Sequence, residues 1–175
     1  MTDDTDPSRR LELVDDLTVL DREILWRGCS ILTVEERGPG LPAFAATLGL
    51  SYIYDHPELV VVGASTDLAV AILAALSDDV RVDGARYGRW SRPAIEGIRF
   101  DLLEVLPAHF EHLMAFWVAY GKERSAAALT HGALQVVVPD RYFCACHARR
   151  KYWLDDPRPL VARPRSKQRR RHRAS

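Results

Sequence analysis

An uninterrupted apolar run at residues 59–62, Leu-Val-Val-Val, constrains this chain more than any other feature of its sequence. No polar residue alternates with the apolar ones, a pattern that is typical of a strand buried on both faces. Such a strand belongs in the middle of a sheet that is covered on each side. We therefore expect helices packed on a central sheet.

Three segments have the apolar spacing of helices that could form those layers. Residues 11–26 form the first, which Gly28 can end, and residues 68–76 form the second, after capping residues at 65–67. Residues 110–120 form the third. Strands are expected where β-branched and aliphatic residues cluster, at 29–34, 43–50, 98–106 and 133–138, and turns or loops at 35–42, 52–55 and 78–93.

This order predicts an α+β fold rather than a doubly wound parallel sheet. The short connections between the first strands favour antiparallel neighbours, so we expect a single domain with a mixed or mainly antiparallel sheet and packed helices. Residues 1–10 are expected to be a flexible arm, residues 11–157 the α+β domain, and residues 158–175 a disordered basic tail.

Charge is distributed unevenly along the chain. The tail holds 8 of the 24 lysines and arginines and no acidic residue, so the other 157 residues carry a net charge of −8. An acidic body is not typical of a nucleic-acid-binding domain. The tail is either solvated or makes non-specific contacts with polyanions. Without an apolar run of 18 residues or a signal sequence, a cytoplasmic protein with no membrane partner is expected.

His56, followed by Pro57 and Glu58, is the strongest candidate for a catalytic residue. It lies between an expected turn and a rigid strand, where a side chain can project over a cleft. An imidazole beside a carboxylate can act as a general base, and flanking Asp55 and Glu58 would raise its pKa. The structural alternative is that His56 caps the turn and donates a hydrogen bond to a loop carbonyl.

Three other polar residues could converge with His56 if their strands are neighbours. Thr47 and Gln135 are candidates for ligand binding, and Asp140 is a candidate catalytic carboxylate together with Glu58. Taken singly, a structural role is favoured for each: Gln135 would satisfy a buried backbone group, and Asp140 would make a turn after Pro139.

Metal binding is not expected, although two clusters resemble ligand sets. Cys144, Cys146 and His147 lie close together, but zinc sites commonly space two cysteines by two residues, and there is no second pair. Loop thiols without a metal are the alternative. His109 and His112 share a helix face without the His-Glu-x-x-His order of a metalloprotease, so a solvated helix face is expected.

Three ordered segments resemble a bacterial family of domains of unknown function, number 4262. They are residues 44–50 (Phe-Ala-Ala-Thr-Leu-Gly-Leu), 56–63 (His-Pro-Glu-Leu-Val-Val-Val-Gly) and 135–140 (Gln-Val-Val-Val-Pro-Asp). The resemblance covers roughly residues 28–160. The family usually has tyrosine at Ala46, glycine at Asp55 and tryptophan at Val138, and often tryptophan at Cys29, so this member is divergent. The resemblance implies a fold and no activity.

No phosphate-binding loop, nucleophile elbow or kinase signature is present in the sequence. The leading hypothesis is therefore a module that binds an unknown small molecule or protein. One alternative is a small hydrolase-like enzyme that uses His56 with a carboxylate. Another is a flavin-binding split barrel, based on a loose similarity of residues 49–50 and 57–59 to flavin-reductase domains. The sequence does not identify a cofactor.

Overall fold

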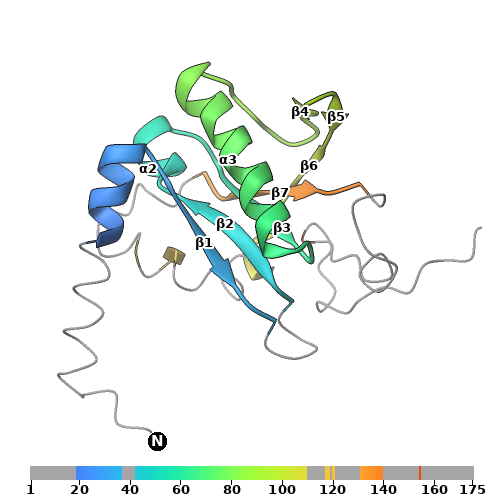
Figure 1. The fold of residues 1–175 in the computed structure, drawn as a ribbon, viewed down its shortest axis with the longest axis horizontal. Helices are drawn as coiled ribbons and strands as arrows, with labels where there is room; N and C mark the ends of the chain where they lie inside the picture. The colour runs from blue at the N-terminus through green and yellow to red at the C-terminus, as the bar shows by residue number, and fades with distance from the viewer. Residues whose placement is uncertain are drawn as a thin grey trace, which may run out of the picture.

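A five-stranded mixed sheet forms the centre of the protein (Figure 1). The structure is a computed structural model, and it describes residues 19–36, 42–109, 117, 118, 120, 131–139 and 154. The strands lie in the order β1 (Ser30–Val34), β2 (Phe44–Leu48), β3 (Glu58–Val62), β7 (Ala133–Val137) and β6 (Asp101–Glu104). Only the β3–β7 pair is parallel among these, so the expected α+β fold with a mixed sheet is confirmed.

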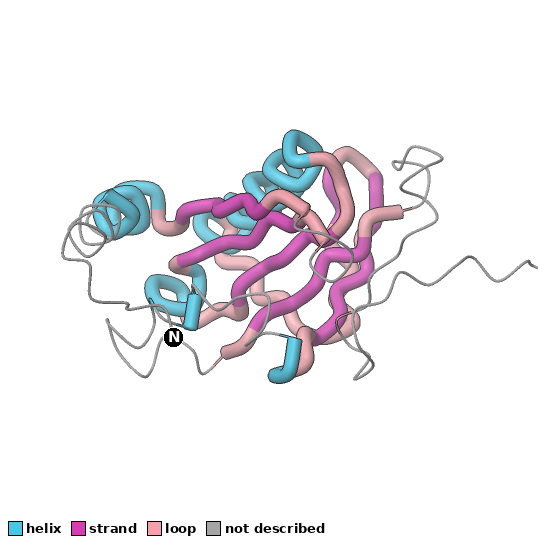
Figure 2. The backbone as a smooth tube through the Cα atoms, turned by 90° about the horizontal axis from the view of Figure 1, so that it is seen from below, coloured by secondary structure: helices cyan, strands magenta, loops and turns pink. Residues whose placement is uncertain are grey.

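Both faces of the central strands are covered, as the apolar run predicts. On one face, α3 (Thr66–Val82) packs against alternate residues of the sheet that include Leu59 and Val61. On the other face, Val60 and Val62 lie in a cluster with Ile24, Phe44, Trp117, Tyr120 and Leu154. Figure 2 shows the strands side by side in one twisted sheet. Every residue of β2 and β3 is buried.

Two helices differ in extent from the sequence prediction. The structure has α3 at Thr66–Val82, where residues 78–93 were expected to be loop. Ser77 and Val80 continue its buried stripe, and the exposed Asp78 pairs with Arg81 on the solvent side, so the aspartates do not end the helix. The expected turn at 52–55 lies mostly within α2 (Leu50–Tyr54). This helix of five residues is too short to show a helical spacing of apolar residues in the sequence.

The expected strand at 98–106 is divided in two. A small hairpin joins β4 (Ala94–Ile95) to β5 (Ile98–Arg99), and β6 begins after Phe100. Backbone bonds of Trp90 and Ser91 with Leu102 bring the preceding loop alongside β6. The loop between α3 and β4 is therefore fastened to the sheet.

The helices expected at residues 11–26 and 110–120 lie only partly within the described residues. Residues 19–27 are helical, and Gly28 follows with a left-handed φ of 84°. Residues 107–109, 117, 118 and 120 are helical too. The expected arm at 1–10, the tail at 158–175, and Asp140, Cys144, Cys146, His147 and His112 lie outside the described residues.

Candidate functional site

The connection from α2 to β3 carries His56 and places its ring inside the protein. Asp55 ends α2 with a left-handed φ of 54°, which turns the chain sharply toward β3. The next residue, His56, is 1% exposed. The short helix and the left-handed residue together point this side chain inward rather than over open solvent.

Both ring nitrogens of His56 contact backbone groups. Nδ1 donates to the carbonyl of Pro57 at 2.7 Å, and Nε2 accepts the N–H of Tyr87 at 3.0 Å. The ring of Tyr87 also packs edge-on, with centroids 5.6 Å apart. Because one nitrogen donates and the other accepts, this network holds the neutral imidazole.

The pKa of His56 is lowered, chiefly because burial disfavours the charged ring, and also because Arg86 and His131 are nearby. The sequence-based expectation was a raised pKa, from flanking carboxylates. The two carboxylates face other partners instead: Asp55 contacts His131, and Glu58 contacts Thr47. Proximity along the chain did not place them at the ring.

Glu58 and Thr47 do come together, as a buried cluster that joins β2, α2 and β3. The carboxylate of Glu58 accepts bonds from the Thr47 hydroxyl at 2.6 Å, the Gly49 N–H at 3.0 Å and the Ser51 N–H at 3.1 Å. Thr47 Oγ1 in turn accepts the N–H of Leu59 at 2.8 Å. Burial raises the pKa of Glu58 despite these three donors. Glu58 thus accepts the N–H groups of the N-cap residue Gly49 and of Ser51 in the first turn of α2, which has no side-chain bond from its own cap.

Gln135 lies apart from the Glu58 cluster, in the middle of β7. It is in register with Val60 on one side and Leu103 on the other. Its side-chain oxygen accepts the N–H of Leu154 at 2.8 Å, and the Leu154 carbonyl accepts the N–H of Leu106. Gln135 therefore joins Leu154 to the sheet.

A cleft of about 450 Å³ opens where β3 and β7 begin and β6 ends. Its lining includes the apolar residues Pro57, Val105, Ala133 and Leu134. The ionisable residues of the lining are Arg89, Glu104 and His131; Gly88, Pro107 and Gly132 complete it. His56 is not part of the lining. Its neighbour Pro57, whose carbonyl accepts the hydrogen bond of His56 Nδ1, does line the cleft.

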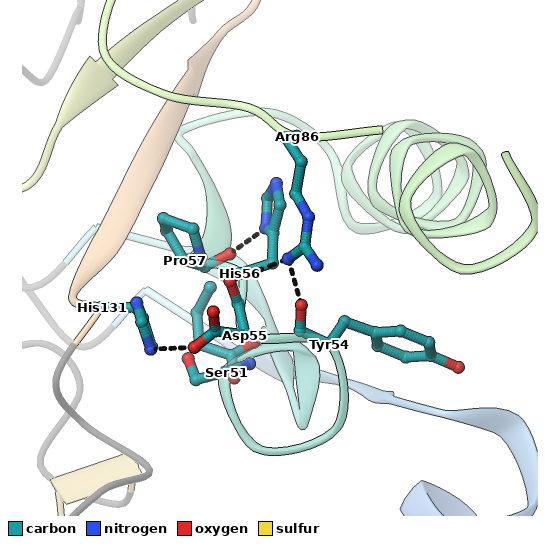
Figure 3. Close-up of polar contacts among 8 residues, drawn as sticks. Ser51, Tyr54, Asp55, His56, Pro57, Arg86 and His131 are labelled. Atoms are coloured by element: carbon teal, nitrogen blue, oxygen red, sulfur yellow. Dashed lines mark hydrogen bonds and ion pairs between the residues drawn. The ribbon is translucent and has the colours of Figure 1, made fainter. Parts of the chain in front are cut away.

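His131, which lines this cleft, forms an imidazole–carboxylate pair with Asp55 that the sequence did not indicate (Figure 3). His131 Nε2 is 2.7 Å from Asp55 Oδ1. The His131 side chain is one-third exposed, and the carboxylate of Asp55 is mostly exposed. His131 stands directly before Gly132 and the β7 strand, just as His56 stands before β3. The same argument about strand entries would have selected it.

Metal binding finds no support in the described part of the chain, where no three His, Cys, Asp or Glu side chains are grouped to hold an ion. His109 is buried, which corrects the expectation of a solvated helix face. Cys29, the one described cysteine, has a pKa raised by burial. Among the described helices, none is both long and apolar enough to cross a bilayer.

Comparisons with known proteins give one match. No curated protein and no solved structure matches the chain. Among protein families, Domain of unknown function (DUF4262) matches residues 23–142, which include every strand of the central sheet.

Proposed function

The chain belongs to the DUF4262 family, and we propose that its domain binds a small polar molecule in the cleft at the start of β3 and β7. The observation that carries the proposal is the composition of the cleft wall. An apolar surface with a few ionisable groups around it is the usual character of small-molecule sites. The volume of about 450 Å³ is within the range of about 300–1,000 Å³ that such sites occupy.

Charges of both signs line the cleft, which favours a ligand that carries both. Arg89 offers a guanidinium to a carboxylate, and Glu104 offers a carboxylate to an ammonium group. Arg89 lies 5.1 Å from the ring centroid of Trp90, so stacking restricts the guanidinium and leaves its N–H edges available. The apolar residues between the charged groups would receive an aliphatic side chain. A zwitterion such as an apolar amino acid fits this chemistry.

The pair of His131 and Asp55 also suits recognition of a hydrogen-bonding ligand. With Nε2 held by Asp55, the ring can present Nδ1 as an acceptor. In the family pattern, position 55 is usually glycine, which fits the left-handed backbone there but would leave His131 without this partner. Asp55 therefore gives this member a feature that the family pattern lacks.

The alternatives from the sequence have less support. A hydrolase that uses His56 would need a free ring nitrogen, and both accept or donate a bond within the protein. The described cleft lining holds no serine, threonine or cysteine to act as a nucleophile. For the flavin alternative, a barrel would be expected, and the described strands form an open sheet with β1 and β6 at its edges.

Three probes that differ in one charge each test the proposal: L-leucine, leucinamide and N-acetylleucine. Each would be titrated into ¹⁵N-labelled protein while the amide signals of Gly88, Gly132 and Ala133 are followed. Leucine should shift these signals. Each analogue should bind about tenfold or more weakly, because a hydrogen bond to a charged group contributes about 1.5–3 kcal/mol.

Variants identify the responsible side chains. Arg89→Met should abolish the preference for leucine over leucinamide, which lacks the carboxylate. Glu104→Gln should abolish the preference over N-acetylleucine, which lacks the ammonium. Arg92→Met is a matched control, since Arg92 pairs with Asp101 outside the cleft lining. Equal binding of all three probes, or no shift with any of them, would refute the proposed ligand class.

A further inference from the structure

We propose that His56 is a proton-sensitive latch, whose protonation releases the loop that forms one wall of the cleft. The loop comprises residues 84–90, between α3 and the hairpin of β4 and β5. Only the consequence for ligand binding rests on the proposed function, because the release of the loop can be measured without a ligand.

His56 holds the middle of this loop through a contact that depends on the neutral ring. The N–H of Tyr87 donates to the unprotonated Nε2 at 3.0 Å. Since Nδ1 already carries the ring proton and donates to Pro57, added acid can protonate only Nε2. Two N–H groups would then face each other at this distance, so the bond that closes the latch cannot survive protonation.

The surroundings of His56 make a charged ring unfavourable in the closed position. Arg86 of the loop lies beside it, donating to the carbonyls of Tyr54 and Asp55, and His131 approaches from the turn before β7 (Figure 3). The nearby acids have other partners: Asp55 pairs with His131, Glu58 with Thr47, and Asp79 of α3 with the hydroxyl of Tyr87. Release of the loop is the route by which a charged ring can reach water.

The latch acts on the cleft because the loop continues directly into its wall. Gly88 and Arg89 follow Tyr87 and line the cleft. Farther along, the Trp90 N–H is bonded to the Leu102 carbonyl, and before the latch the Ala85 N–H is bonded to the Asp79 carbonyl. These outer bonds do not involve a titrating acceptor. Between them, Arg86, the Tyr87 hydroxyl and the Gly88 N–H also make bonds that do not involve His56. Acid therefore removes the Tyr87 N–H contact from this segment, and we expect its loss to loosen the loop at Tyr87, directly before Gly88 and Arg89.

Hydrogen exchange at the Tyr87 amide tests the latch. Protection would be normalised to the intrinsic exchange rate and compared with that of Leu59 and Val61 in β3. Between pH 7.5 and 5.5, the protection of Tyr87 should fall about tenfold, because each pH unit below an ordinary histidine pKa of about 6.5 shifts the open-to-closed ratio by up to about tenfold. The β3 amides should stay protected.

Two variants separate His56 from the other titrating groups. His56→Gln keeps a neutral acceptor near the position of Nε2, so the protection of Tyr87 should no longer depend on pH. His131→Gln should retain the wild-type dependence. The proposal fails if Tyr87 protection is constant from pH 7.5 to 5.5 in the wild type, or if it falls equally in His56→Gln. Loss of β3 protection in His56→Gln would mean that this variant is not properly folded. The proposal is then decided by the wild type and His131→Gln, in which the protection of Tyr87 should fall with pH while that of the β3 amides should not.

A final titration with leucine at both pH values distinguishes the latch from the proposed function. Weaker leucine binding at pH 5.5 than at pH 7.5 in the wild type, but not in His56→Gln, supports both. A pH-dependent Tyr87 amide without leucine binding at either pH supports the latch and refutes the ligand. Leucine binding with a pH-independent Tyr87 amide refutes the latch and leaves the binding function intact.

Discussion

Replacing Glu58 by alanine should destabilise the protein severely, because three buried donors depend on its carboxylate. The change leaves the Thr47 hydroxyl and the N–H groups of Gly49 and Ser51 without their acceptor. Each unsatisfied buried donor costs about 1–3 kcal/mol, so the expected loss for the three is about 3–9 kcal/mol, with the lower value if water enters the space. Against a typical total of about 5–15 kcal/mol, this is a large share.

Glu58→Gln is the informative companion to that substitution. Its side-chain oxygen can still accept the two N–H groups, and its amide can donate to Thr47 Oγ1. We therefore expect a loss of about 1 kcal/mol. Urea unfolding followed by circular dichroism measures both variants, with Glu35→Ala as an exposed control that should change stability by less than about 0.5 kcal/mol. Equal losses for alanine and glutamine would refute the hydrogen-bond argument.

The pH dependence of the same residue has a definite sign. Burial raises the pKa of Glu58 above its ordinary value of 4.5, so above that pH the folded state binds more protons than the unfolded state. The contribution of Glu58 is therefore fully present below pH 4.5 and is lost as the pH rises through the raised pKa. The stability of the wild type relative to Glu58→Gln should decline over that interval. A relative stability that increases with pH would contradict the direction of the shift.

Three further predictions test the packing and the chain ends. Gly49→Ala should cost about 1–3 kcal/mol, since φ is 119° there and an added Cβ would lie 2.8 Å from a methyl carbon of Ile24; an unchanged urea midpoint would count against this. Leu73→Ala should cost about 2–5 kcal/mol as a core cavity, whereas Val82→Ala, on the exposed side of α3, should change the midpoint little. Deleting residues 163–175 should leave the melting temperature nearly unchanged and abolish any salt-sensitive binding of DNA or RNA; a clearly lower melting temperature or retained binding would refute the prediction of a disordered tail that contacts polyanions.

The local pattern of apolar residues in the sequence was enough to predict a central sheet with helices packed on it. The apolar run of β3 predicted a strand with both faces covered, and the spacing of apolar residues predicted the helix that covers one of them. Both predictions concern burial, which a sequence encodes as periodicity at short range. The element boundaries were less certain, as α3 shows: Asp78 and Asp79 resemble a turn but lie in the helix.

The roles of the polar residues were decided only by the tertiary structure. Glu58 follows His56 by two residues, yet its carboxylate faces Thr47, eleven positions away, because the β2–β3 pairing brings those two together. His56 finds its partner Tyr87 at a distance of 31 residues, and Asp55 meets His131 only because β7 lies parallel to β3. Hydrogen bonds are made between groups that are neighbours in space. Sequence can nominate such groups, but strand order and register select their partners.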